Sequence, residues 1–423
     1  MKQNFKNYKL DNGLEIILAP QEDSFTTTVM ATAKVGSKHE TRELNGISHF
    51  LEHLGFKGTN KRPSQVEIAS EFENLGATYN AFTNREYTSY YAKGRSGVWG
   101  DLLDIIADMY KNSILPEKEI EKERGVIIEE INMYDDDPKR KVFDLLFESS
   151  YKNHSLGRSV LGKKEVIKNL SREDFQEYRN ENYVANNTIV TVAGNLNPDV
   201  EKSINSLFSE LKEGNNTQSK KALNKQKEVR ELVHNKDSAQ THLRIGFRAF
   251  GTEDDRKYPL KILSNVLGGG ISSRLFQKIR SEMGAAYYVG SKNHLLRGTG
   301  LFLVSAGVKN SKTQAAIKAT MKELKKIKEE GIKEKELKKS KNHIIGNLMT
   351  GLETSSSLAR FYSDQAARSE QILNPEEIIK KLKSVSIKSV KSVANDLFKN
   401  KNLNLALIGP FQKGDFVDIL NVD

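Results

Sequence analysis

The segment His49-Phe50-Leu51-Glu52-His53 carries the most chemical information in this sequence. The surrounding pattern predicts a helix, and on a helix residues three and four positions apart share a face. The imidazoles of His49 and His53 can therefore meet one metal ion. The carboxylate of Glu52 shares that face with His49, where it can take a proton from water bound to the ion. The alternative is a pair of helix histidines packed in a core.

A third ligand is expected on another element, because a hydrolytic zinc site usually has three protein ligands and one open position. The expected helix Pro116–Tyr134 offers Glu123, Glu129 and Glu130. Glu129 shares its helix face with polar residues, which indicates a solvated position. Glu130 shares its face with Ile127, and a carboxylate on an apolar face needs a compensating partner. We therefore expect Glu130 to be the third ligand.

Glu123 lies two helical turns from Glu130, roughly 10 Å along the helix axis. That distance is too long for both carboxylates to bind one ion easily. It suits Glu123 to a supporting role, in which its carboxylate accepts a hydrogen bond from a ligand histidine and orients the ring. For Glu130 taken alone, a solvated helix face is the simpler interpretation. The histidine pair is what favours the ligand role.

Strand and helix patterns alternate along the chain, and their order recurs. Before residue 212 we expect elements at about 28–35, 46–55, 64–75, 77–93, 98–113, 116–134, 142–151, 171–183 and 188–193. After residue 237 we expect them at about 242–250, 257–267, 272–282, 285–296, 300–308 and 403–408, with long helices before the last strand. Residues 213–237 lose apolar periodicity and become rich in Lys, Asn and Gln. This order predicts a duplication, with domains at 1–212 and 238–423 and a linker at 213–237.

The composition limits the classes of protein that fit. A chain of 423 residues is too long for one compact core, and no apolar run approaches the roughly 18 residues of a membrane span. The absence of cysteine excludes disulfides and thiolate metal ligands. The first residues show neither the apolar core of a signal peptide nor a transit pattern rich in Arg and Ser. We therefore expect a cytoplasmic protein that does not contact a membrane.

The formal net charge of +11 suggests nucleic-acid binding as one function. Much of the excess lies in lysine runs at 325–328 and 338–341 on expected helices, where Glu329 and Glu336 are among the interleaved glutamates. Interleaved charges are typical of a solvated helix face. Because no recognised nucleic-acid-binding module accompanies these runs, we do not expect nucleic acid as a partner. A gel-shift assay at several salt concentrations would separate this alternative.

The His-x-x-Glu-His pattern is the signature of inverzincins. On this pattern and its surroundings, the chain resembles the M16 (pitrilysin- and insulinase-like) metallopeptidases over nearly its whole length. The likeness is greatest to half-length M16B members of the type of the mitochondrial processing peptidase β subunit. The motifs that carry the resemblance are His49–His53 with the following Leu54–Thr59, then Asn80–Thr83, Glu123–Glu130, Ser272–Phe276, Arg280 and Tyr287. In that family the ligand glutamate follows the pentad after 76 residues, a gap that residues 54–129 supply here, so the resemblance also selects Glu130.

The resemblance implies where a peptide substrate would bind. In the family, the strand formed here by Asn80, Ala81, Phe82 and Thr83 is an edge that receives the substrate as an added β-strand. Main-chain hydrogen bonds along such an edge tolerate many substrate sequences. From the residues alone, an ordinary hairpin strand is an equal alternative.

Two residues of the second half also receive roles by resemblance. Arg280 and Tyr287 match a pair that hydrogen-bonds the substrate and the developing oxyanion in relatives. The alternative is a surface arginine and a core tyrosine. Glu123 matches the family's supporting glutamate. Met283 departs from the family, where a basic residue is frequent, and we do not expect this to disturb the metal.

Gly268-Gly269-Gly270 is the remaining motif that could bind a ligand. No Gly-Lys-Ser/Thr follows it, so a phosphate loop is not indicated. We expect a helix stop before a cap at Ser272. The other histidines have no ligand spacing and are expected to be structural or surface residues.

These features predict an α+β protein with two homologous domains, each a mainly antiparallel sheet with helices packed on one face, as in half of an M16 clamshell. The expected activity is a zinc-dependent endopeptidase that hydrolyses peptides or small unfolded polypeptides inside a dimeric chamber, with one Zn²⁺ per subunit. The resemblance implies a homodimer, or a heterodimer with a paralogue. The alternative function is that of a non-catalytic partner subunit of an M16-type complex.

Overall fold

The computed structural model describes residues 5–215, 217–223, 226–369 and 371–423, and they form two compact units. Unit 1 comprises Met1–Asn132, Arg158–Lys220 and Met349–Glu376. Unit 2 comprises Met133–Gly157, Lys221–Leu348 and Glu377–Asp423. Each unit therefore combines segments from both halves of the sequence.

Unit 1 is built on a sheet with the strand order β1-β2-β6-β3-β5-β4. Its strands are β1 (Lys6–Lys9), β2 (Glu15–Pro20), β3 (Thr26–Ala33), β4 (Thr78–Thr83), β5 (Thr88–Arg95) and β6 (Thr188–Gly194). Only the β2–β6 pair is parallel. The central strands are rich in Thr and Val, whose branched side chains suit a pleated surface. Strand β4 lies at the edge of this sheet.

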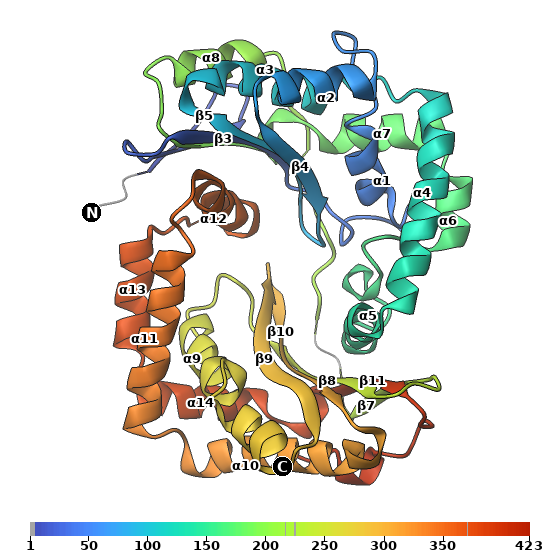
Figure 1. Cartoon of the computed structure of the whole chain (residues 1–423), viewed down its shortest axis with the longest axis vertical. Helices are drawn as coiled ribbons and strands as arrows, with labels where there is room; N and C mark the ends of the chain where they lie inside the picture. The colour runs from blue at the N-terminus through green and yellow to red at the C-terminus, as the bar shows by residue number, and fades with distance from the viewer. Residues whose placement is uncertain (1–4, 216, 224–225, 370) are drawn as a thin grey trace. The chain divides into compact units, whose positions relative to one another are not determined.

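Helices cover both faces of the unit 1 sheet. They are α1 (Ile47–Leu54), α2 (Gln65–Asn74), α3 (Trp99–Asn112), α4 (Glu117–Asp136), α6 (Lys164–Asn169), α7 (Arg172–Asn182), α8 (Val200–Phe208) and α12 (Ser355–Arg368). Figure 1 shows α3 on one side of β3 and β5 and α12 on the other, in agreement with the contacts of both helices. The last turn of α4 is counted with unit 2.

Unit 2 has a sheet with the order β7-β11-β8-β10-β9. Its strands are β7 (Arg230–Asn235), β8 (Thr241–Ala249), β9 (Ala286–Leu296), β10 (Thr299–Val308) and β11 (Leu403–Gly409). Its helices are α5 (Pro138–Ser150), α9 (Lys257–Gly268), α10 (Thr313–Glu330), α11 (Glu334–Thr350), α13 (Pro375–Ser384) and α14 (Ile387–Leu397), and a π-helical turn spans Phe276–Glu282. The last two residues of α11 and the first two residues of α13 are counted with unit 1.

The two sheets have the same topology. The order β2-β6-β3-β5-β4 in unit 1 corresponds strand for strand to β7-β11-β8-β10-β9 in unit 2. In both sheets the first of these pairs is parallel and the others are antiparallel. The predicted fold class, two related α+β units with mainly antiparallel sheets, is confirmed, but helices cover both faces of each sheet and not the one face expected. The duplication recognised from the order of elements is thus also visible in strand pairing.

Each sheet also carries one helix from the other half of the chain on its second face. In unit 1, Leu358 and Tyr362 of α12 pack with Ile17 and Ile189 of the sheet. In unit 2, α5 packs through an apolar cluster against β10 and β11. Strands β6 and β11 are buried along their whole length, so both of their faces need apolar cover. The helices α12 and α5 supply it.

Because each unit contains segments from both halves of the chain, the units differ from the continuous domains expected at 1–212 and 238–423. One of the places where the chain passes between the units, Lys220–Lys221, lies inside the stretch 213–237 expected to be a linker. The segments that contain α5 and α12, however, belong to the unit of the opposite half. Helical periodicity marks an amphipathic helix but does not say which sheet the helix covers. No helix in the described ranges is long and apolar enough to cross a membrane.

Candidate metal centre

The N-terminus of α1, the helix that carries the pentad, is capped by the side chain of Glu40. The carboxylate of Glu40 is buried and accepts hydrogen bonds from the backbone N–H groups of Gly46 (2.8 Å) and Ser48 (3.1 Å). These are unpaired donors at the start of α1, where the helix dipole also favours an anion. Gly46 has φ 102°, and a Cβ there would lie 2.7 Å from the carbonyl oxygen of Leu161. Glu40 and Gly46 together fix where α1 begins.

His49 and His53 lie one turn apart on α1, as expected. Their ring centroids are 4.7 Å apart, with an angle of 68° between the ring planes. His49 is buried, with 7% of its surface exposed, and His53 is half-buried. Burial, together with the neighbouring His53, lowers the pKa of His49 to about 3. The ring is therefore neutral at physiological pH, the form in which imidazole binds a metal.

Glu130 reaches the two histidines from α4. Its Oε2 atom lies 3.6 Å from Nε2 of His49 and 3.7 Å from Nε2 of His53. One ligand atom from each of these three side chains lies within 4.8 Å of the others, and this is the one such group among the described residues. Glu129 is exposed and accepts a hydrogen bond from the side chain of Asn132 (3.3 Å). Glu130 therefore faces the histidine pair and Glu129 faces solvent, as their positions on the helix predict.

Glu123 lies behind the metal-facing side of His53. Its Oε2 atom is 2.9 Å from Nδ1 of His53, so this nitrogen carries the proton and Nε2 is left facing Glu130. Burial raises the pKa of the Glu123 carboxyl, but its hydrogen bonds with His53 and Lys57 outweigh this effect, so the pKa is lowered. Glu123 is thus an anionic acceptor, placed where a supporting residue was expected.

Glu52 lies beside the three candidate ligands. Burial raises the pKa of its carboxyl, and Oε2 is buried without a hydrogen-bond partner among the described residues. Glu52 and His53 line a hollow of about 290 Å³ in unit 1. The other lining residues are Phe56, Lys57, Gln65, Ile68, Ala69, Tyr79, Asn80 and Glu123. A buried carboxylate oxygen without a partner, next to a hollow, is a group placed to exchange a proton.

The residues expected to receive a peptide strand lie on β4. This strand pairs with β5 on one side only, and α1 packs against it. Ala81 is buried, whereas Asn80 is exposed, and Phe82 and Thr83 are half-buried. The structure therefore brings the sheet edge and the pentad helix together within unit 1.

Arg280 and Tyr287 belong to unit 2. Arg280 lies in the π-helical turn, with its guanidinium 4.9 Å from the ring centre of Phe276. Tyr287 is the second residue of β9 and is 58% exposed. The alternative of a core tyrosine is therefore excluded, and both Arg280 and Tyr287 are exposed residues of unit 2.

The sequence pattern did not point to two residues at this site, Glu40 and Lys57. Glu40 gave no signal, because it precedes the helix that it caps by several residues. Lys57 lies within the motif Leu54–Thr59, and its position shortly after His53 is the sequence feature that could have indicated a role at the site. It is buried and contacts Glu123.

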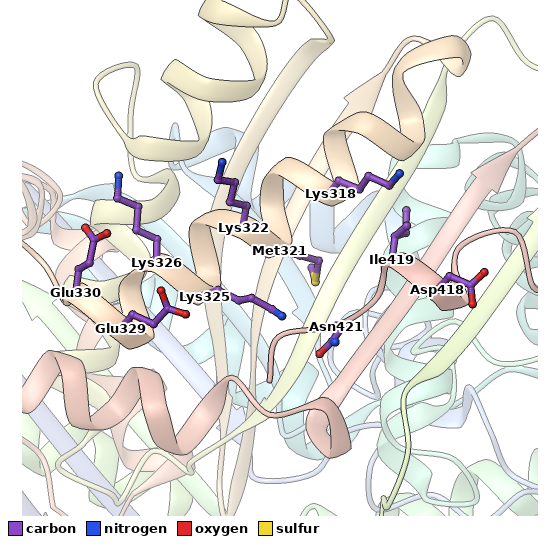
Figure 2. Close-up of a pocket in the computed structure, with 10 residues that line it drawn as sticks. All are labelled: Lys318, Met321, Lys322, Lys325, Lys326, Glu329, Glu330, Asp418, Ile419 and Asn421. Carbon is purple, nitrogen blue, oxygen red and sulfur yellow. The ribbon is translucent and has the colours of Figure 1, made fainter.

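A larger hollow, of about 610 Å³, lies on unit 2 along α10 and the C-terminal segment (Figure 2). Its lining residues are Lys318, Met321, Lys322, Lys325, Lys326, Glu329, Glu330, Asp418, Ile419 and Asn421. Figure 2 shows Lys322 and Lys326 pointing away from the C-terminal segment. None of the lining residues is a histidine, so this hollow offers no counterpart of the metal-ligand set.

The donor set on unit 1 suits zinc. Two imidazole nitrogens and one carboxylate oxygen converge, and the buried Glu52 carboxylate lies next to them. Zinc in hydrolytic sites takes such a set of three and leaves a further position open. On unit 2, the sequence of α9 contains neither histidine nor glutamate. The fold and the site together define a two-unit protein of the inverzincin type, with one candidate zinc centre among the described residues.

The comparisons with known proteins identify the family. Residues 16–164 match the model of insulinase (peptidase family M16), and residues 169–344 match that of the peptidase M16 inactive domain. An uncharacterized zinc protease of Bacillus subtilis, YmxG, is 36% identical over 413 residues, which are 96% of this chain and 98% of that protein. An uncharacterized zinc protease of Rickettsia felis is 35% identical over 97% of this chain and 98% of its own. The chain belongs to peptidase family M16.

Two solved structures have the same fold. A protease from Helicobacter pylori superimposes with a TM-score of 0.91 at 26% identity, over 96% of this chain and all of that chain. A putative M16-like peptidase from Alicyclobacillus acidocaldarius has a TM-score of 0.84 at 20% identity, over 97% of this chain and 99% of its own, and shares the fold. The predicted resemblance to half-length M16 members is confirmed.

Proposed function

We propose that this chain is a zinc-dependent endopeptidase. The observation that supports the proposal most directly is the convergence of His49, His53 and Glu130, with half-buried Glu52, whose Oε2 atom is buried, beside them. The names of the relatives as zinc proteases agree with this choice of metal. His49, His53 and Glu130 would hold one Zn²⁺ in each subunit.

When bound, zinc would polarise the carbonyl of the peptide bond and lower the pKa of water, so that the water can lose a proton near neutral pH. Glu52 is the general base of the proposed reaction. Its carboxylate accepts a proton from water and later donates it to the leaving amine of the cleaved peptide. The raised pKa that burial gives Glu52 suits the first step, because a more basic carboxylate takes up a proton more readily. Glu123 keeps the ring of His53 in one tautomer throughout.

The edge strand β4 is the proposed binding site for the substrate backbone. Its outer edge has no neighbouring strand in the described sheet, so its N–H and C=O groups can pair with an extended peptide. Residues Asn80, Ala81, Phe82 and Thr83 lie on this strand. Pairing through the main chain favours a broad range of peptides or small unfolded polypeptides.

Arg280 and Tyr287 are proposed to donate hydrogen bonds to the substrate and the developing oxyanion. Both have exposed polar groups on unit 2, where a peptide can reach them. We further propose that the chain forms a homodimer in which this pair completes the site of the partner subunit. A heterodimer with a paralogue is the alternative assembly.

The experiment that tests the proposal incubates the purified protein with a peptide library, with and without a chelator, and identifies products by mass spectrometry. Cleavage that the chelator abolishes and zinc restores is the expected result. The Glu52→Gln variant is the control against a contaminating protease. If the wild-type protein binds zinc but cleaves nothing, the function of a non-catalytic M16 partner subunit replaces the proposal.

A further inference from the structure

Lys57 is a buried cation next to the proposed zinc centre. It follows the end of α1, and its backbone N–H donates to the carbonyl of Leu54 (3.1 Å), which continues the helical path. Only about 10% of its side chain is exposed. A buried ammonium group needs an anionic or polar partner, so its contacts indicate what it does.

Among the residues that the structure describes, the ammonium group of Lys57 has two side-chain partners. It forms an ion pair with Oε1 of Glu123 and donates a hydrogen bond to Oε1 of Gln65 (2.8 Å). Gln65 is the first residue of α2, and Glu123 lies on α4. Lys57 therefore connects the end of α1 to two other helices.

The carboxylate of Glu123 is held at both oxygens. Oε1 contacts Lys57, whereas Oε2 lies 2.9 Å from Nδ1 of His53. With a single partner, a carboxylate can rotate about its terminal torsion, which is broad and roughly two-fold. With a different partner at each oxygen, the plane of the Glu123 carboxylate is fixed. The orientation of the His53 ring then depends on Lys57 as well as on Glu123.

We propose that Lys57 is a positioning residue of the zinc centre, which acts through Glu123 to hold Nε2 of His53 toward the metal. The proposal rests on the proposed zinc site. Lys57 does not touch the ligand atoms of His49 or Glu130. Lys57 fixes the carboxylate of Glu123, which in turn fixes the ring of His53, and so Lys57 pre-organises the site.

Zinc affinity of the metal-free protein, measured by competition with a chromophoric chelator, tests this role. Lys57→Met removes the ammonium group and keeps an unbranched apolar side chain. We expect zinc affinity to fall about tenfold, the lower range for loss of a residue that supports a metal ligand. Lys57→Arg, which restores a cation beside Glu123, is expected to recover most of the affinity.

The matched control is Lys61→Met. Lys61 is a solvated lysine four residues further on, whose side chain is 59% exposed and pairs with Asp104. Its loss is expected to leave zinc affinity unchanged. Thermal unfolding of each metal-free variant shows whether the protein still folds, so that affinities are compared only between folded proteins.

A double-variant cycle separates a positioning role from general packing. If Lys57 acts through Glu123, then Lys57→Met should add less than about twofold to the loss in affinity caused by Glu123→Gln. Additive losses, or a Lys57→Met protein with wild-type affinity, would overturn the inference while the zinc site stands. If the wild-type protein itself binds no zinc, the proposed function fails instead. If Lys57→Met does not fold, the same comparison is made with Gln65→Ala, which removes the second partner of Lys57 at an exposed position.

Discussion

Nε2 of His49 lies 3.6 Å from Oε2 of Glu130, although the two residues are far apart in sequence and lie on different helices. The neighbouring Glu129 points away and pairs with Asn132. One residue step along α4 thus separates a carboxylate that faces the histidine pair from one that faces solvent. This difference provides a matched pair of variants.

Glu130→Gln is expected to lose zinc, because a neutral amide oxygen is a much weaker ligand than a carboxylate. We expect affinity to fall by more than about a hundredfold, the upper range for loss of an outer-shell partner alone. Glu129→Gln should bind zinc like the wild-type protein. Metal analysis of both proteins after dialysis checks the prediction, and equal zinc content in the two variants would contradict the ligand role of Glu130.

Glu52→Gln is expected to keep zinc and lose hydrolysis. The change leaves all three candidate ligands in place and removes the base. General acid–base groups typically contribute about 10²- to 10⁴-fold to a rate, so kcat should fall by at least a hundredfold. Peptide cleavage assays, with zinc content measured on the same sample, check this. A variant that cleaves peptides at a rate near that of the wild type would show that Glu52 is not the base.

Arg62→Met is expected to destabilise unit 1. Arg62 is only 3% exposed and pairs with Asp108 (2.7 Å) and Asp104 (2.6 Å). Asp108 is itself buried, so the substitution leaves its carboxylate without a cationic partner among the described residues, with hydrogen bonds from Thr59 and Asn112 alone. Removing one partner of a buried ion pair typically costs about 3–5 kcal/mol of the free energy of unfolding. Urea unfolding of the metal-free protein measures this loss.

The control for Arg62 is again Lys61→Met. This lysine contacts Asp104 from the solvent side, and exposed ion pairs contribute about 0–1 kcal/mol. Its loss should therefore change the free energy of unfolding by less than about 1 kcal/mol. Equal destabilisation by the two substitutions would mean that burial of Arg62 does not govern its contribution.

Arg280 and Tyr287 are expected to act on the site of a partner subunit. The test mixes two inactive proteins, Glu52→Gln and the double variant Arg280→Ala/Tyr287→Phe. Subunit exchange combines an intact zinc site with an intact Arg/Tyr pair in one of the two sites of the heterodimer, so activity should return. Exchange is followed by native mass spectrometry. If exchange occurs and the mixture stays inactive, the pair does not act across subunits.

Several elements could be predicted within a few residues because their signals are local. A helix was expected at about 64–75, and the side chain of Ser64 caps α2 (Gln65–Asn74) by accepting a hydrogen bond from the N–H of Glu67. The helix expected to begin near Val142 begins instead at Pro138. Asp137 caps it, and Pro138 occupies the first turn, where its missing N–H is not needed. The expected start was therefore four residues too late.

The local sequence pattern was sufficient to predict which side chains of the proposed centre share one face of a helix. His49, Glu52 and His53 share a helical face through backbone geometry alone, and Glu130 stood out because it shared a face with Ile127. Steric limits and hydrogen bonds between neighbouring residues set this periodicity, so it can be read from a short stretch of sequence. The same information does not show what approaches that face.

Contacts between distant segments were settled by the folded chain. The ion pair of Lys57 with Glu123, the cap that Glu40 gives α1, and the placement of α5 and α12 on the sheets of the opposite halves join residues with no shared local pattern. Which segments pair depends on the total apolar surface buried and on whether each buried charge finds a partner across the whole unit. The pentad and its periodicity therefore specify which side chains share the candidate metal-binding face of α1, whereas the long-range packing of helices decides which side chains meet that face.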